Sequence, residues 1–154
     1  MSKGEKDTMV KYWVIPITYD NWLVSHKERV YGFGQSLEGI IKKGDIIIFY
    51  VMKSKCNNPD YAMCFANAYE VVSDWFREDK PLWPDEVEAR KVLYPYRVKI
   101  KLVKEGRVRV KDIIDRLSFV VKKDVWYAYF LGCPANFKKP IPEKDAKLII
   151  RSLK

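Results

Sequence analysis

The chain has 154 residues, which favours one domain, and its 48% hydrophobic and 32% charged residues are typical of a globular protein rather than a disordered one. No apolar run approaches the roughly 20 residues that a membrane-spanning helix requires. The formal net charge is +9, which points toward a polyanionic partner.

The first half of the chain predicts two buried strands with a short helix between them. Residues 12–18 are aromatic and β-branched and predict a strand, in which Pro16 marks a bulge or an unpaired position. Asp and Asn at the start of residues 20–27 predict the cap of a short helix. Two glycines within residues 31–34 predict a loop where the backbone approaches another group closely. The apolar run 46–51 predicts a strand that is buried on both faces.

The second half predicts two more strands and ends in a helix. Residues 62–73 predict a strand, followed by a long irregular segment. Residues 96–102 alternate apolar and basic side chains, so we expect one face in the core and the other to present Arg97, Lys99 and Lys101. Further elements are predicted at 110–117 (helix), 126–130 (a short strand or the start of a helix) and 142–153 (an amphipathic helix). Together these elements predict an α+β fold, a small curved or barrel-like mixed β-sheet with short peripheral helices and a C-terminal helix.

The positive charge is unevenly distributed along the chain. Residues 97–123 hold ten basic and three acidic side chains, whereas residues 70–90 have a net charge of −4. A basic region beside an acidic one favours nucleic acid as a partner. An acidic protein partner, or a merely solvated lysine-rich surface, remains an alternative.

The sequence contains no recognisable catalytic, cofactor or metal motif. The three cysteines form no CxxC pair and the chain has one histidine, so we expect neither a metal nor a cofactor. Residues 34–39 read GxSxxG rather than the GxSxG turn of many hydrolases. A hydrolase that uses Lys, Thr and Glu stays possible, because such a set leaves no local pattern. The first residues lack an apolar signal segment, so we expect a cytoplasmic protein with no membrane contact.

Aromatic side chains are abundant, and several lie in predicted loops or at strand ends beside glycine, proline or charged residues. Most aromatic side chains in proteins are packing residues. Loop aromatics near a basic strand also suit base stacking, which contributes roughly 1–3 kcal/mol per base. Charge and aromatic content together favour a nucleic-acid-binding function.

A set of ordered segments resembles the EVE domain family, in particular its small archaeal members grouped as UPF0310 proteins. The segments are Tyr12-Trp13-Val14-Ile15, Asn21-Trp22, Val30-Tyr31-Gly32-Phe33, Lys43-Gly44-Asp45 and Tyr94-Pro95-Tyr96-Arg97-Val98. The resemblance predicts a flexible tail over residues 1–10 and one domain over 11–154. It implies a PUA-like β-barrel, related to YTH and ASCH domains, that binds RNA or DNA.

The resemblance also implies an aromatic pocket for a flipped, modified base. The pocket candidates are Trp13, Thr18, Asn21, Trp22, Tyr31, Gly32, Phe33, Tyr50 and Trp126. We expect the nucleic-acid backbone to be held by Arg97, Lys99, Lys101, Arg107, Arg109 and Lys111. The alternatives are an ASCH-like hydrolase acting on a modified nucleoside and a basic protein-interaction module.

Overall fold

A computed structural model of the chain describes residues 9–120 and 140–154. Most of the predicted tail, the segment 126–130 and with it Trp126 lie outside the described residues. The strands are β1 (Tyr12–Ile17), β2 (Val30–Phe33), β3 (Ile46–Val51), β4 (Cys64–Val71), β5 (Phe76–Arg77) and β6 (Tyr96–Arg109). The helices are α2 (Tyr19–Glu28), α3 (Pro84–Ala89), α4 (Val110–Ile113), the 3₁₀ turn η1 (Ile114–Arg116) and α6 (Glu143–Ser152).

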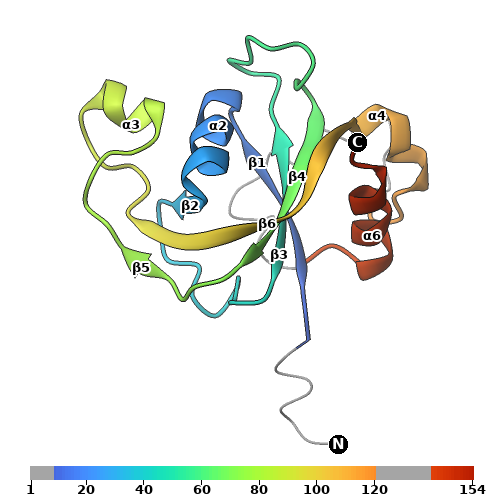
Figure 1. Cartoon of the computed structure of the whole chain (residues 1–154), viewed down its shortest axis with the longest axis horizontal. Helices are drawn as coiled ribbons and strands as arrows, with labels where there is room; N and C mark the ends of the chain where they lie inside the picture. The colour runs from blue at the N-terminus through green and yellow to red at the C-terminus, as the bar shows by residue number, and fades with distance from the viewer. Residues whose placement is uncertain (1–8, 121–139) are drawn as a thin grey trace, which may run out of the picture.

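The described strands form one curled sheet in the order β1-β3-β4-β6-β2, with β5 paired to β6 (Figure 1). The pair β1–β3 is parallel, and the other pairs are antiparallel. The long strand β6 pairs with β2 and β5 near its start and with β4 along the rest of its length. Because one strand serves two groups of partners, the sheet curls into a half-barrel, which confirms the predicted fold class.

The bend in β4 has an identifiable residue at its centre. Asn67 has φ of 63° and is skipped in the pairing with β6 between Ala66 and Ala68, as in a β-bulge. Its side-chain oxygen accepts a hydrogen bond of 2.8 Å from the N–H of Gly106 on the opposite strand. The bulge therefore keeps a cross-strand bond while it adds local twist.

Two hydrophobic cores cover the two faces of the sheet. Inside the curl, the side chains of Ile15, Phe49 and Tyr69 pack in one core with the helix α2. On the outer face, α4 and α6 cover a second core that contains Val14 and Ile48. Neighbouring residues of β1 and β3 thus enter opposite cores, which explains why these strands are apolar at nearly every position.

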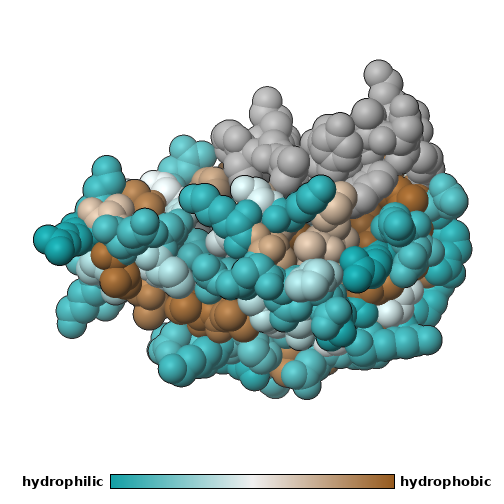
Figure 2. All heavy atoms as spheres, turned by 90° about the horizontal axis from the view of Figure 1, so that it is seen from above, coloured by the Kyte–Doolittle hydropathy of each residue, from teal (hydrophilic) through white to brown (hydrophobic). Residues whose placement is uncertain are grey.

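The remaining surface is mainly polar. The face seen in Figure 2 is mostly hydrophilic, with hydrophobic groups in separate patches toward both ends. No helix among the described residues is long and apolar enough to cross a membrane.

Four details differ from the sequence-based expectations. The loop predicted at residues 31–34 is wrong, because β2 extends to Phe33, but the close approach of the backbone is confirmed at Gly32. The segment expected to be irregular contains β5 and α3. Pro16 is paired with Tyr50 in an unbroken register, so it marks neither a bulge nor an unpaired position, and it lies on a strand at one end of the described sheet order. Arg97 is not presented with Lys99 and Lys101, because it is only 4% exposed.

Candidate functional site

A cavity of about 240 Å³ lies where β1 ends and α2 begins, and β2 and the segment around α3 close it. Four aromatic side chains line this cavity, which we call the aromatic pocket: Tyr31, Phe33, Trp83 and Tyr94. Apolar groups of Pro16, Ile17 and Met52 and the backbone of Gly32 complete the apolar lining. A small, aromatic-lined cavity with a few polar groups is the usual form of a ligand site.

The polar groups of the pocket come from the first turns of α2. Thr18 is the N-cap of this helix, and its hydroxyl accepts a bond of 3.4 Å from the N–H of Asn21. Asn21 and Ser25 follow at helical spacing, so both lie on the side of the helix that faces the pocket. Asn21 is 8% exposed, and its amide offers both a donor and an acceptor group.

The indole of Trp83 is fixed on both its edge and its face. Its Nε1–H donates to the hydroxyl of the fully buried Ser25 at 2.9 Å. Its ring lies so close to Gly32 that a Cβ at that position would be 2.5 Å from the ring. Glycine therefore lets β2 pass beside this tryptophan without displacing its ring.

Tyr94 forms another wall and points its hydroxyl at a carboxylate. The hydroxyl donates a short hydrogen bond to Asp85. Burial raises the pKa of Tyr94, and the bond to Asp85 raises it further. The hydroxyl is protonated at neutral pH, as in tyrosine generally, and acts as a donor to Asp85.

A buried carboxylate organises the segment that carries Trp83 and Tyr94. The fully buried Glu86 accepts backbone hydrogen bonds of 2.7–3.2 Å from Leu82, Trp83, Leu93 and Tyr94. The guanidinium of Arg97 lies 3.6 Å from this carboxylate and 4.9 Å from the ring centre of Trp83. Arg97 also donates to the carbonyl of Tyr94 at 2.9 Å. Arg97 is therefore a positioning residue for the pocket walls, not an exposed contact for a nucleic-acid backbone.

The structure brings five of the nine pocket candidates together and places three elsewhere. Thr18, Asn21, Tyr31, Gly32 and Phe33 all line the aromatic pocket. Trp13 lies in the core, where its Nε1–H donates to Asp45 at 3.0 Å. Trp22 donates to the carbonyl of Ala66, and Tyr50 belongs to the outer core. The ninth candidate, Trp126, is outside the described residues.

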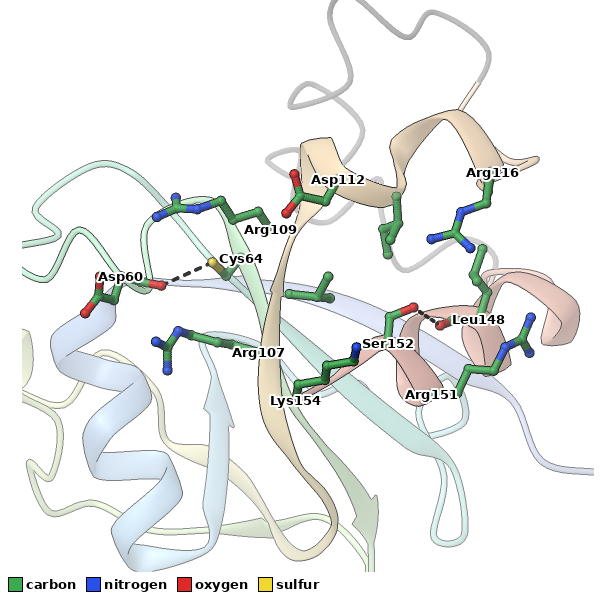
Figure 3. Close-up of a pocket in the computed structure, with 12 residues that line it drawn as sticks. Asp60, Cys64, Arg107, Arg109, Asp112, Arg116, Leu148, Arg151, Ser152 and Lys154 are labelled. Carbon is green, nitrogen blue, oxygen red and sulfur yellow. Dashed lines mark hydrogen bonds between the residues drawn. The ribbon is translucent and has the colours of Figure 1, made fainter.

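The backbone-binding candidates other than Arg97 are exposed. They fall into two groups along β6 and the turn after it. Lys99 and Lys101 lie toward the start of the strand, whereas Arg107 and Arg109 line a second, larger pocket near its end (Figure 3). Lys111 is exposed on α4.

Sequence reasoning missed Ser25, Trp83 and Tyr94 as members of the pocket. The signal was present, since Trp83 and Tyr94 are aromatic residues beside prolines in a segment without an apolar period. Their assignment requires the contacts of α3 with α2, which no local pattern shows. Among residues 9–120 and 140–154, no group of three or more His, Cys, Asp or Glu side chains could hold a metal ion.

The fold and the pocket together define a class of protein, a small α+β domain with a half-barrel sheet and an aromatic pocket. The family model of the EVE domain matches residues 11–152, and the chain belongs to the EVE domain family. A UPF0310 protein of Saccharolobus solfataricus is 38% identical over 143 residues, which cover 93% of this chain and 95% of the relative. A UPF0310 protein of Pyrococcus abyssi is 30% identical, with 91% and 97% covered.

Solved structures of YTH domains have the same fold. The Pho92 YTH domain, solved in complex with m6A, has a TM-score of 0.58 at 17% identity and covers 92% of this chain and 84% of its own. A Mmi1 YTH domain has a TM-score of 0.57 at 14% identity, with 92% of both chains covered. These similarities confirm the predicted relation in fold to YTH domains.

Proposed function

We propose that this protein binds RNA or DNA and holds one flipped, modified base in the aromatic pocket beside a basic surface. The observation that carries the proposal is the convergence of four aromatic and three polar side chains on one small cavity. Two proteins of the same fold support this class of ligand, because their structures were solved with m6A and with N6-methyladenosine RNA.

The size of the pocket favours a single base as its occupant. At about 240 Å³ it lies below the roughly 300–1,000 Å³ of pockets that enclose drug-sized ligands. One ring system fits this volume, whereas a whole nucleotide needs more room. The sugar and phosphates then remain outside. Lys99 and Lys101 are exposed on β6, the strand that pairs with the pocket-lining strand β2, and offer positive charge.

The energetics favour a base in a single strand. Stacking on aromatic rings contributes roughly 1–3 kcal/mol per base, and flipping a base out of a duplex costs a few kcal/mol. An unpaired strand avoids part of that cost, so we expect it to bind more tightly than a duplex. The amide of Asn21 and the hydroxyl of Thr18 recognise the polar edge of the base. A buried methyl mark contributes only about 0.8 kcal/mol, a roughly fourfold gain in affinity.

The test is quenching of tryptophan fluorescence by short single-stranded RNA and DNA oligomers at two salt concentrations. Each oligomer is used without a modified base and with one N6-methyladenine or 5-methylcytosine. We expect salt-sensitive quenching that is stronger for one modified oligomer. Absence of quenching by every oligomer at low salt would contradict the proposal.

A pair of phenylalanine variants tests the location of the base. Phe33 lines the pocket, whereas Phe76 lies on β5 away from it and is 36% exposed. The loss of stacking in Phe33→Ala weakens binding by about 1–3 kcal/mol, which is roughly 5- to 150-fold in Kd. Phe76→Ala leaves the affinity within twofold of the wild type. Equal affinities of the two variants would place the base elsewhere.

A further inference from the structure

A second pocket lies toward the end of β6, and none of its described lining residues also lines the aromatic pocket. It has a volume of about 640 Å³ between β6, the α4–η1 turn and the end of α6 (Figure 3). Five cationic side chains line it: Arg107, Arg109, Arg116, Arg151 and Lys154. We call it the basic pocket.

The cations of the basic pocket come from three separate parts of the chain. Arg107 and Arg109 alternate along β6 and therefore share one face of the strand. Arg116 belongs to η1, and Arg151 belongs to α6. Figure 3 draws the first two beside Asp60 and Cys64 and the other two on the side of α6. The fold thus brings together charges from separate parts of the sequence. A lysine-rich surface segment that is merely solvated would not need such an arrangement.

These charges are only partly neutralised by the protein. Among the residues that the structure describes, the lining contains two carboxylates, Asp60 and Asp112, against five cations. Among the described residues, the ion pairs within 4.0 Å involve none of the five cations. Concentrated positive charge that is not paired with carboxylates attracts and binds anions.

Two of the arginines are nevertheless held in place by uncharged groups. The guanidinium of Arg107 lies 4.8 Å from the ring centre of Tyr61. Arg109 donates to the carbonyl of Pro59 at 3.3 Å. Ordering of these long side chains in advance lowers the entropy that a ligand must remove on binding. These contacts orient the charges without neutralising them.

The chemistry of arginine selects the class of ligand. Its planar guanidinium matches the spacing of phosphate oxygens and binds them through paired hydrogen bonds. The pocket, of about 640 Å³, is wider than one phosphate group needs, and its arginines lie on both sides of the end of β6 (Figure 3). We infer that the basic pocket binds a group of two or more phosphates, either in a nucleic-acid strand or in a free polyphosphate.

The test uses a labelled abasic oligodeoxynucleotide of twelve units in fluorescence anisotropy titrations. This probe has a phosphate backbone and no bases, so it cannot use the aromatic pocket. The double variant Arg116→Gln/Arg151→Gln is compared with Lys43→Gln/Lys144→Gln, whose lysines are exposed and do not line either pocket. Both double variants remove two positive charges, and all four side chains are exposed, so thermal melts should show the same folded state.

We expect the arginine variant to bind the abasic probe at least tenfold more weakly than the lysine variant does. Equal affinities would overturn the inference. Competition by millimolar tripolyphosphate supports a site that also accepts free polyphosphates, and its absence supports a site for an extended strand. Phe33→Ala should bind the abasic probe like the wild type, so failure of the base-binding proposal is distinguishable from failure of this one.

Discussion

Gly32 shows how one residue sets the width of the aromatic pocket. A Cβ built there would be 2.5 Å and 2.8 Å from two ring carbons of Trp83 and 3.0 Å from the Cβ of Tyr94. The ring has no simple way to retreat, because its Nε1–H is bound to Ser25. Steric demand in the pocket wall therefore decides the residue type at this position.

We expect Gly32→Ala to lower the free energy of unfolding by about 1–3 kcal/mol, the usual cost of overpacking a filled interior. Base-dependent quenching should weaken as well, since the displaced indole changes the pocket. Gly34→Ala is the matched control, because its Cβ would lie 3.5 Å from the nearest atom, a carbonyl oxygen, in ordinary contact. Urea denaturation of both variants measures the difference, and equal midpoints would show that Trp83 can move freely.

Single residues were the hardest feature to infer from sequence. Trp13 and Asp45 both lie in segments that match the family pattern, but their hydrogen bond joins residues 32 positions apart through the pairing of β1 with β3. The alternation of apolar and basic residues along β6 predicted that Arg97 is exposed. That prediction is wrong, because Arg97 is buried beside the buried carboxylate of Glu86. Both cases depend on tertiary contacts between polar groups, which leave no local period.

At the scale of elements, the strongest local patterns were reliable. The structure confirms the strands predicted at 12–18, 46–51 and 62–73 and the final helix after Pro142, which have strong apolar patterns. The short strand β2 was missed because its glycine disfavours a strand locally. Its pairing with β6 and the contact with Trp83 outweigh that preference.

The helix α2 contains the only histidine of the chain. The Nδ1 of His26 lies 2.6 Å from the hydroxyl of Tyr69, 3.0 Å from the guanidinium of Arg29 and 3.2 Å from the amide nitrogen of Asn67. Two of these groups can only donate, so Nδ1 is an acceptor and the neutral ring carries its proton on Nε2. Burial lowers the pKa of His26, and the charge of Arg29 lowers it further, while Glu105 opposes the shift.

The lowered pKa of His26 predicts a loss of stability in mild acid. The unfolded chain binds a proton near the ordinary pKa of about 6.5, whereas the folded chain binds it only at lower pH. The stability that the neutral His26 contributes to the folded state is therefore fully present above pH 6.5, and it is lost as the pH falls through the pKa of His26 in the folded chain. Urea midpoints measured from pH 8 to pH 5 should fall more for the wild type than for His26→Gln. An NMR titration that places the pKa of His26 at or above 6.5 would refute the prediction.

At the scale of the whole molecule, the proposed binding energy comes from two kinds of contact, those of basic side chains with phosphates and those of the aromatic pocket with a base. Contacts with phosphates release counterions and depend on salt, whereas stacking in the aromatic pocket is nearly independent of it. The net charge of +9 and the exposed lysines of β6 belong to the first kind. The pocket between β1, α2 and α3 belongs to the second. A salt titration can therefore separate the two contributions.

We expect Lys99→Gln/Lys101→Gln to reduce the slope of log affinity against log salt by about 1.4, because each phosphate contact of a single strand contributes roughly 0.7. Phe33→Ala should keep the wild-type slope and lower the affinity by a similar factor at every salt concentration. The measurement is anisotropy of a base-bearing oligomer between low and physiological salt. A changed slope in Phe33→Ala, or an unchanged slope in the lysine variant, would mean that the bases and the phosphates do not contact separate surfaces of the domain.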